Sequence, residues 1–177
     1  MSIWKFLGLD PKKLGGGAKP ASAAETETVR KIVASLDALE PEQARFIAAF
    51  AYLLTRVAHA DHHLSAEEAA TIERIVREHG ALSEAQAVLV AQVAKTQNLL
   101  FSGTENFLVA REFTRIASHE QKLHLIDCLY AVCGADRSIS VVEDNEINKI
   151  ANELKLDHAD FIAVRLRHRD HLAVLKK

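Results

Sequence analysis

The 177-residue chain is 49% hydrophobic and carries a formal net charge of −2, so it can bury one sizeable core and is not basic enough for a general nucleic-acid binder. The charge is uneven, because residues 1–20 sum to +3 and residues 165–177 to +4, which leaves −9 between them. Cys128 and Cys133 lie five positions apart, the wrong spacing for a CxxC pair, and we expect buried free thiols. No apolar run approaches the roughly 20 residues of a membrane span, so we expect a cytoplasmic protein.

Residues 1–24 combine a short apolar segment with a flexible linker rich in Gly, Pro, Lys and Ala. The segment carries Trp4, Phe6 and Leu9, and burying each of them is worth roughly 1.5 to 3 kcal/mol. We therefore expect these three side chains to dock, either back on their own domain or on a membrane surface or protein partner. Nearby lysines would favour an anionic membrane surface.

Residues 25–177 predict an all-α domain, a single bundle of seven to eight helices, because apolar residues recur with a period near 3.6 and no stretch resembles a strand. Pro41 ends the first helix and opens the second, which covers about residues 42–60 and is apolar almost all round. It should lie at the centre of the core. After a helix over residues 66–79, Gly80 stands where a left-handed residue is expected.

The later helices are predicted from the residues that can cap them. A side-chain oxygen at a helix start accepts a hydrogen bond from a backbone N–H group that has no partner within the helix. Where Glu or Gln follows three positions later, it can return a bond to the capping residue. The expected caps are Ser83, Thr104, Ser118, Ser140 and Asp157.

One stretch occurs twice in the chain. Residues 58–76 read AHADHHLSAEEAATIERIV, and residues 133–151 read CGADRSISVVEDNEINKIA. An apolar helix precedes each copy and an amphipathic helix follows it, so the sequence predicts a duplicated helix-loop-helix unit. At a shift of 75 positions, the aligned polar pairs are Asp61 with Asp136, Ser65 with Ser140, and Glu68 with Glu143.

The repeated corners have a structural and a functional interpretation. Ser-x-x-Glu is a capping box worth about 1 kcal/mol at each helix start, which explains the Ser and the Glu. It does not explain the Asp four residues earlier. If the two halves pack as partners, four carboxylates would converge, and their mutual repulsion would favour a bound hard cation such as calcium or magnesium. The twelve-residue loop of an EF-hand is absent.

The pattern A-D-x-x-[LI]-S-x-x-E, present twice between helices over about residues 42–157, resembles the TerB-type tellurite-resistance family. That family is similar in turn to the N-terminal domain of membrane-anchored DjlA-type co-chaperones. The resemblance implies an all-helical fold and a proposed metal site at Asp61, Glu68, Asp136 and Glu143. The family usually has Gly after each Asp, whereas this chain has His62 and Arg137, and a fixed cation beside Asp136 can neutralise its charge without a metal.

The histidines around the first corner have two interpretations. His59, His62 and His63 flank its Asp, and nitrogen ligands would shift the preference toward zinc, but exposed histidines at a helix end are the simpler interpretation. No enzyme signature appears. We therefore expect a non-enzymatic stress or tellurite-resistance protein that binds a divalent cation. The alternative is a protein-interaction module at the inner membrane surface with purely structural corners.

Overall fold

The computed structural model describes residues 23–57, 66–96 and 106–175, and the regular elements in these ranges are helices. Three single 3-10 turns are η1 (Gly134–Asp136), η2 (Arg169–His171) and η3 (Ala173–Leu175). The predicted all-α fold is confirmed. The α-helices of these ranges are α2 (Ala23–Asp37), α3 (Pro41–Thr55), α4 (Ala66–His79), α5 (Glu84–Lys95), α7 (Asn106–Ile116), α8 (His119–Cys133), α9 (Val141–Glu153) and α10 (His158–Arg167).

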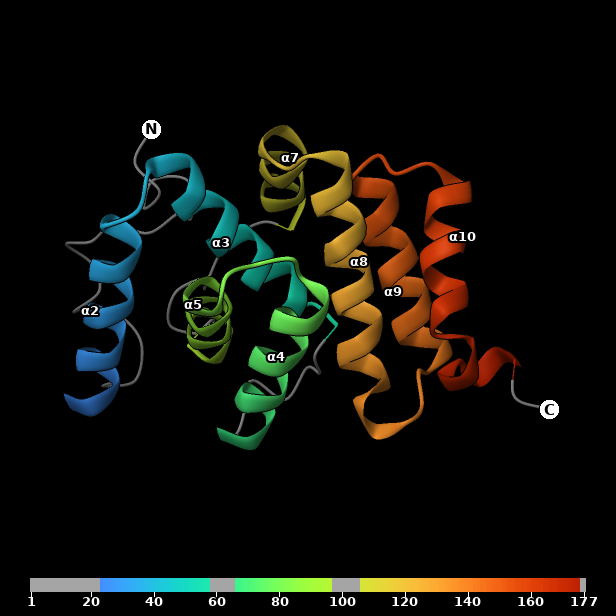
Figure 1. Ribbon diagram of the computed structural model, residues 1–177, viewed down its shortest axis with the longest axis horizontal. Coiled ribbons are helices and arrows are strands. Elements are labelled where there is room, and N and C mark those ends of the chain that lie inside the picture. Colours follow the sequence, from blue (N-terminus) through green and yellow to red (C-terminus); the bar gives the residue numbers. More distant parts are fainter. Residues whose placement is uncertain (1–22, 58–65, 97–105, 176–177) are drawn as a thin grey trace.

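Helix α3 lies at the centre of the molecule, where it packs against α2, α5, α7 and α8 (Figure 1). Residues 46–55 are all buried, as the nearly continuous apolar sequence predicts. The ring of Phe46 stacks on that of Phe113 in α7, with 5.2 Å between the ring centroids. The helix ends at Thr55, five residues before the predicted end, and Arg56 follows it in a turn.

The second half of the chain continues the same core. Helices α8, α9 and α10 lie side by side, and α4 packs against α8 from the first half (Figure 1). Buried side chains from both halves belong to one hydrophobic cluster. The division into a segment over residues 1–24 and a domain over residues 25–177 remains a prediction, because residues 1–22 lie outside the described residues.

Local capping rules account for the starts of α5, α8 and α9. Ser83, Ser118 and Ser140 each form the predicted capping box. Asp157 occupies the cap position of α10, but its side chain makes no capping hydrogen bond, contrary to the prediction. The carboxylate of Asp160, in the first turn of that helix, lies 3.0 Å from Nε2 of His119. Thr104 lies outside the described residues.

The prediction that Gly80 takes a left-handed conformation is wrong. Ala81, with a φ of 51°, is the residue that takes the left-handed conformation after α4. Gly80 is needed for space instead, since a Cβ atom there would lie 2.5 Å from the carbonyl oxygen of Val76. The chain therefore turns one residue later than the helix-end rule predicts.

Candidate functional site

The second corner is a short turn held at both ends. Helix α8 runs into η1, and Arg137 then adopts a left-handed conformation with a φ of 69°. Ile139 is fully buried, and its backbone pairs with the C-terminal segment. Its N–H donates to the carbonyl of His171 at 2.8 Å, and its carbonyl accepts from the N–H of Ala173 at 2.9 Å. The turn that carries Asp136 is thus fixed between a helix and the chain end.

Both acidic residues of this corner contact backbone N–H groups. Oδ1 of Asp136 accepts from the N–H of Ser138 at 3.0 Å. Oε2 of Glu143 accepts from the N–H of Ser140 at 2.8 Å, and the Ser140 hydroxyl accepts from the Glu143 N–H at 3.2 Å. The capping interpretation is therefore confirmed for this copy of the motif.

Cys133 is buried at the end of α8, directly before this turn. Burial raises the pKa of its thiol, and the charge and hydrogen bond of Glu143 and the charge of Asp136 raise it further. The pKa of Cys128 is raised as well, by burial and by Asp127. Both free cysteines remain protonated at neutral pH, so neither is a ready nucleophile.

The first corner falls largely outside the described residues. Asp61, His59, His62 and His63 belong to residues 58–65, which the structure does not describe, and the same holds for Trp4, Phe6 and Leu9. Glu68 is described, and it lies exposed in the first turn of α4. Among the described residues, no three His, Cys, Asp or Glu side chains are grouped so that they could hold a metal ion.

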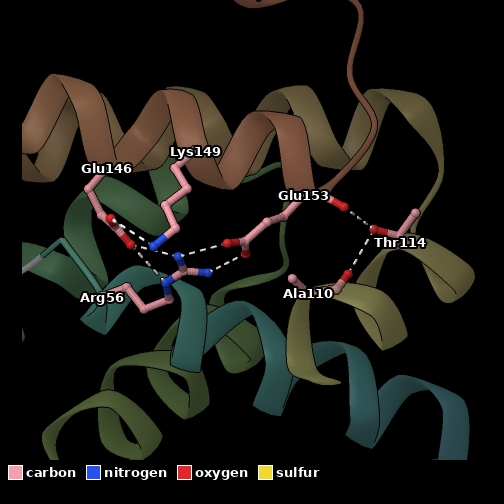
Figure 2. A network of polar contacts seen from close by, with 6 residues as sticks. All are labelled: Arg56, Ala110, Thr114, Glu146, Lys149 and Glu153. Carbon is pink, nitrogen blue, oxygen red and sulfur yellow. Dashed lines mark hydrogen bonds and ion pairs between the residues drawn. The ribbon is translucent and has the colours of Figure 1, made fainter. Parts of the chain in front are cut away.

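A buried arginine links the two halves (Figure 2). The side chain of Arg56 is 5% exposed and reaches from the end of α3 to α9. Its Nη1 donates to Oε2 of Glu153 at 2.6 Å, and its Nη2 donates to Oε1 of Glu146 at 2.6 Å. Burial lowers the pKa of Arg56, but the hydrogen bonds to Glu153 and Glu146 outweigh it, so the net pKa is raised. We call these three residues the Arg56 cluster.

A buried carboxylate forms a second link. Asp127 in the middle of α8 accepts from Nδ1 of His79 at 2.7 Å and from Nε2 of His168 at 2.8 Å. His79 ends α4 and His168 follows α10, so three segments meet at one carboxylate. Burial raises the pKa of Asp127, but the hydrogen bonds from His168 and His79 outweigh it and leave the pKa below its ordinary value. We call this group the Asp127 cluster.

A third polar group adjoins the Asp127 cluster. The ring of Tyr130 stacks on that of His168 with 5.5 Å between centroids, and its hydroxyl donates to Oδ1 of Asp144 at 2.8 Å. Arg165 also binds Asp144, with 2.6 Å between Nη2 and Oδ2. Beside these residues lies an open hollow of about 260 Å³, whose lining includes His79, His168 and His171.

A comparison with protein-family models decides the family. The model of the tellurite resistance protein TerB matches residues 46–166, about two thirds of the chain. The chain belongs to the TerB family. The match runs from within α3 to within α10 and so includes both corners of the TerB pattern. No curated protein and no solved structure matches the chain.

Sequence reasoning identified the TerB family and the acidic corners, but it missed the Arg56 and Asp127 clusters. The sequence contains one indication of each cluster: Arg56 follows a run of apolar residues, and Asp127 interrupts another such run. A charged residue at a core position is rarely buried without a partner. Their partners lie 41 to 97 positions away, and no local pattern identifies them. Among the described residues, no helix is long and apolar enough to cross a membrane.

Proposed function

We propose that this TerB-family protein is a non-enzymatic, cytoplasmic stress-response or tellurite-resistance protein that binds a divalent cation at its acidic corners. The ligands would be Asp61, Glu68, Asp136 and Glu143. The observation that carries the proposal is the second corner itself, where Asp136 lies in a turn that is fixed against the C-terminal segment and Glu143 lies in the first turn of α9. These two carboxylates would supply half of the ligands that the proposal requires.

The donor chemistry fits a hard cation. A carboxylate has about four lone-pair positions on its two oxygens, so a backbone N–H at one oxygen leaves others for a metal. Asp136 is exposed and Glu143 is half-buried, so solvent ions can reach this corner. Oxygen ligands favour calcium or magnesium, and zinc would require nitrogen from His59, His62 or His63.

One observation favours the second candidate, an interaction module at the inner membrane surface. Both acids of the described corner already bind backbone N–H groups, which is enough to explain their presence without a metal. In that case the apolar residues Trp4, Phe6 and Leu9 would dock on the membrane or on a protein partner. Trp4 is the only tryptophan, so its emission would shift to the blue with anionic vesicles and not with neutral ones.

A cation titration followed by NMR tests the first candidate. Calcium or magnesium should shift backbone amides of residues 59–68 and 134–146 in the full-length protein, and Asp136→Asn should weaken the apparent affinity at least about tenfold. Asp157→Asn is the matched control, because Asp157 is an exposed carboxylate at a helix start without a capping bond. Equal titrations for both variants, or no shifts in the wild type, would leave the corners purely structural.

A further inference from the structure

Helix α10 presents an apolar face to solvent. Ala159 and Ala163 are exposed, Leu166 is 50% exposed, and Ile162 is half-buried. These residues follow the i, i+3, i+4, i+7 spacing that places side chains on one face of a helix. Phe161 and Val164 point the opposite way and are buried in the core. The helix is therefore apolar on two faces, although one buried face is enough to hold it in the bundle.

The position of α10 leaves this second face accessible. Helix α8 packs against both α9 and α10, and α10 lies at the end of the molecule opposite α2 (Figure 1). Helix α10 packs against α8 on its inner side. A partner could therefore approach along the whole length of α10 without displacing any described helix.

The charges beside the face indicate what kind of partner fits. Asp160 and Arg167 are seven residues apart and so lie on the same flank of the apolar face, one near each end of the helix. The side chain of Asp160 is 41% exposed, and Arg167 is exposed with no ion pair among the described residues. An antiparallel copy of the same helix would bring each Asp160 to the Arg167 of the other copy. A parallel copy would instead place the charged flanks of the two helices on opposite sides of the contact, where no Asp160 meets an Arg167.

We propose that α10 is the contact surface of a homodimer in which two copies of this chain pair antiparallel about a two-fold axis near Ala163. The small side chains at positions 159 and 163 let the two helix backbones approach, while Leu166 and the exposed part of Ile162, which also packs against the core, fill the space beside them. Such an interface is isologous, because every contact occurs twice. The antiparallel helix dipoles favour the same arrangement.

The size of the contact predicts a weak dimer. A helix of ten residues is about 15 Å long, so the contact is below the size of a standard stable interface. Dissociation constants of roughly 10 µM to 1 mM are expected for such a contact. Association should therefore be visible only when the protein concentration is varied across this range.

Sedimentation equilibrium on the full-length protein tests the proposal. The average mass of the wild type should rise toward that of a dimer between about 10 µM and 1 mM. Ala163→Glu should remain monomeric, because it places a carboxylate at the two-fold axis against its own copy. Ala85→Glu, at an exposed position of α5, is the matched control and should associate like the wild type. A wild-type mass that stays constant and monomeric overturns the proposal, whether the face is covered by another segment of the chain or simply stays in water.

Charge reversal distinguishes this pairing from any other contact. Asp160→Arg and Arg167→Asp should each weaken self-association by at least about tenfold, because each variant faces like charges across the axis. An equimolar mixture of the two variants restores both opposite-charge pairs and should associate at least as well as the wild type. His119→Ala controls for the loss of the contact between Asp160 and His119. If both variants keep their helical circular dichroism and the mixture stays monomeric, the antiparallel arrangement is wrong.

Discussion

The Arg56 cluster and the Asp127 cluster both link the two halves of the chain, but the charges at their centres are opposite. In each cluster, a buried charged side chain from one half of the chain binds partners in the other half or in the C-terminal segment. The arginine keeps its charge at every pH at which the protein is folded, whereas the carboxylate loses its charge in acid. The two links should therefore respond differently to pH, although both join the same two halves.

Their positions in the fold are reciprocal. The Arg56 cluster joins the end of α3, which leads into the first corner, to α9, which leaves the second. The Asp127 cluster joins the end of α4, which leaves the first corner, to α8, which leads into the second. Each helix-loop-helix unit is thus tied to the other by a charge contact of its own. This arrangement holds the helices around both corners in fixed relation.

The largest effect is expected from Arg56→Met. This change removes the buried cation between Glu146 and Glu153, whose side chains are 30% and 21% exposed, and leaves Glu146 with the exposed Lys149 at 3.9 Å. Breaking a buried ion pair from one side costs roughly 3 to 5 kcal/mol of unfolding free energy. Urea denaturation at neutral pH measures the loss.

The control for this prediction is Arg74→Met, which breaks the exposed pair between Arg74 and Glu78. Exposed ion pairs are worth about 0 to 1 kcal/mol, so this variant should lose little stability. Arg56→Lys should lie between the two, because it keeps the charge but not the forked geometry of the guanidinium. Equal losses for Arg56→Met and Arg74→Met would contradict a stabilising role for the cluster.

The next effect, and the one that separates the clusters by pH, is expected from Asp127→Asn. Hydrogen bonds to a charged group contribute roughly 1.5 to 3 kcal/mol, so the variant should lose about that amount of stability at pH 7. The folded pKa of Asp127 lies below its ordinary value of 3.8, so its contribution is present above that value and is lost as the pH falls through the folded pKa.

The stability difference between wild type and Asp127→Asn should accordingly shrink below about pH 4. Unfolding free energies of the wild type and of Asp127→Asn from pH 7 to pH 3 check this expectation. A difference for Asp127→Asn that stays constant over this range would show that its carboxylate does not stabilise the fold through its charge.

The sequence was sufficient to predict what depends on near neighbours. Helix period, the proline at the start of α3 and the three capping boxes all involve residues within four positions of one another, and the structure confirms them. The same local pattern identified the TerB corners and therefore the family. Local rules failed at two positions: at Gly80 the space beside Val76 decides the residue, and at Asp157 the side chain makes no capping hydrogen bond.

The clusters that join the two halves could not be predicted from local sequence patterns. Arg56 and Glu153 are 97 positions apart, and their contact depends on where the end of α3 lies relative to α9. The period of each helix says which face is buried but not which distant helix covers it. For the candidate site the sequence identified the acids of the second corner, but not the left-handed turn at Arg137 or the pairing of Ile139 with the C-terminal segment.

The smallest effect is expected from Tyr130→Phe, beside the Asp127 cluster. Tyr130 is fully buried, and burial together with Asp144 raises the pKa of its hydroxyl, which therefore stays protonated and donates to that carboxylate. Removing the hydroxyl does not orphan a charge, because Arg165 still donates to both oxygens of Asp144. The phenylalanine ring can keep the stacking contact with His168.

The expected loss for Tyr130→Phe is therefore about 1 kcal/mol, the value of one ordinary hydrogen bond, and smaller than that for Asp127→Asn. Arg165→Met is the informative companion, because it leaves the Tyr130 hydroxyl as the remaining donor to Asp144 and should cost more. In the double variant Asp144 loses both donors, so the combined loss should exceed the sum of the two single losses. Additive losses in urea denaturation would mean that the two donors act independently and that Asp144 is not held redundantly.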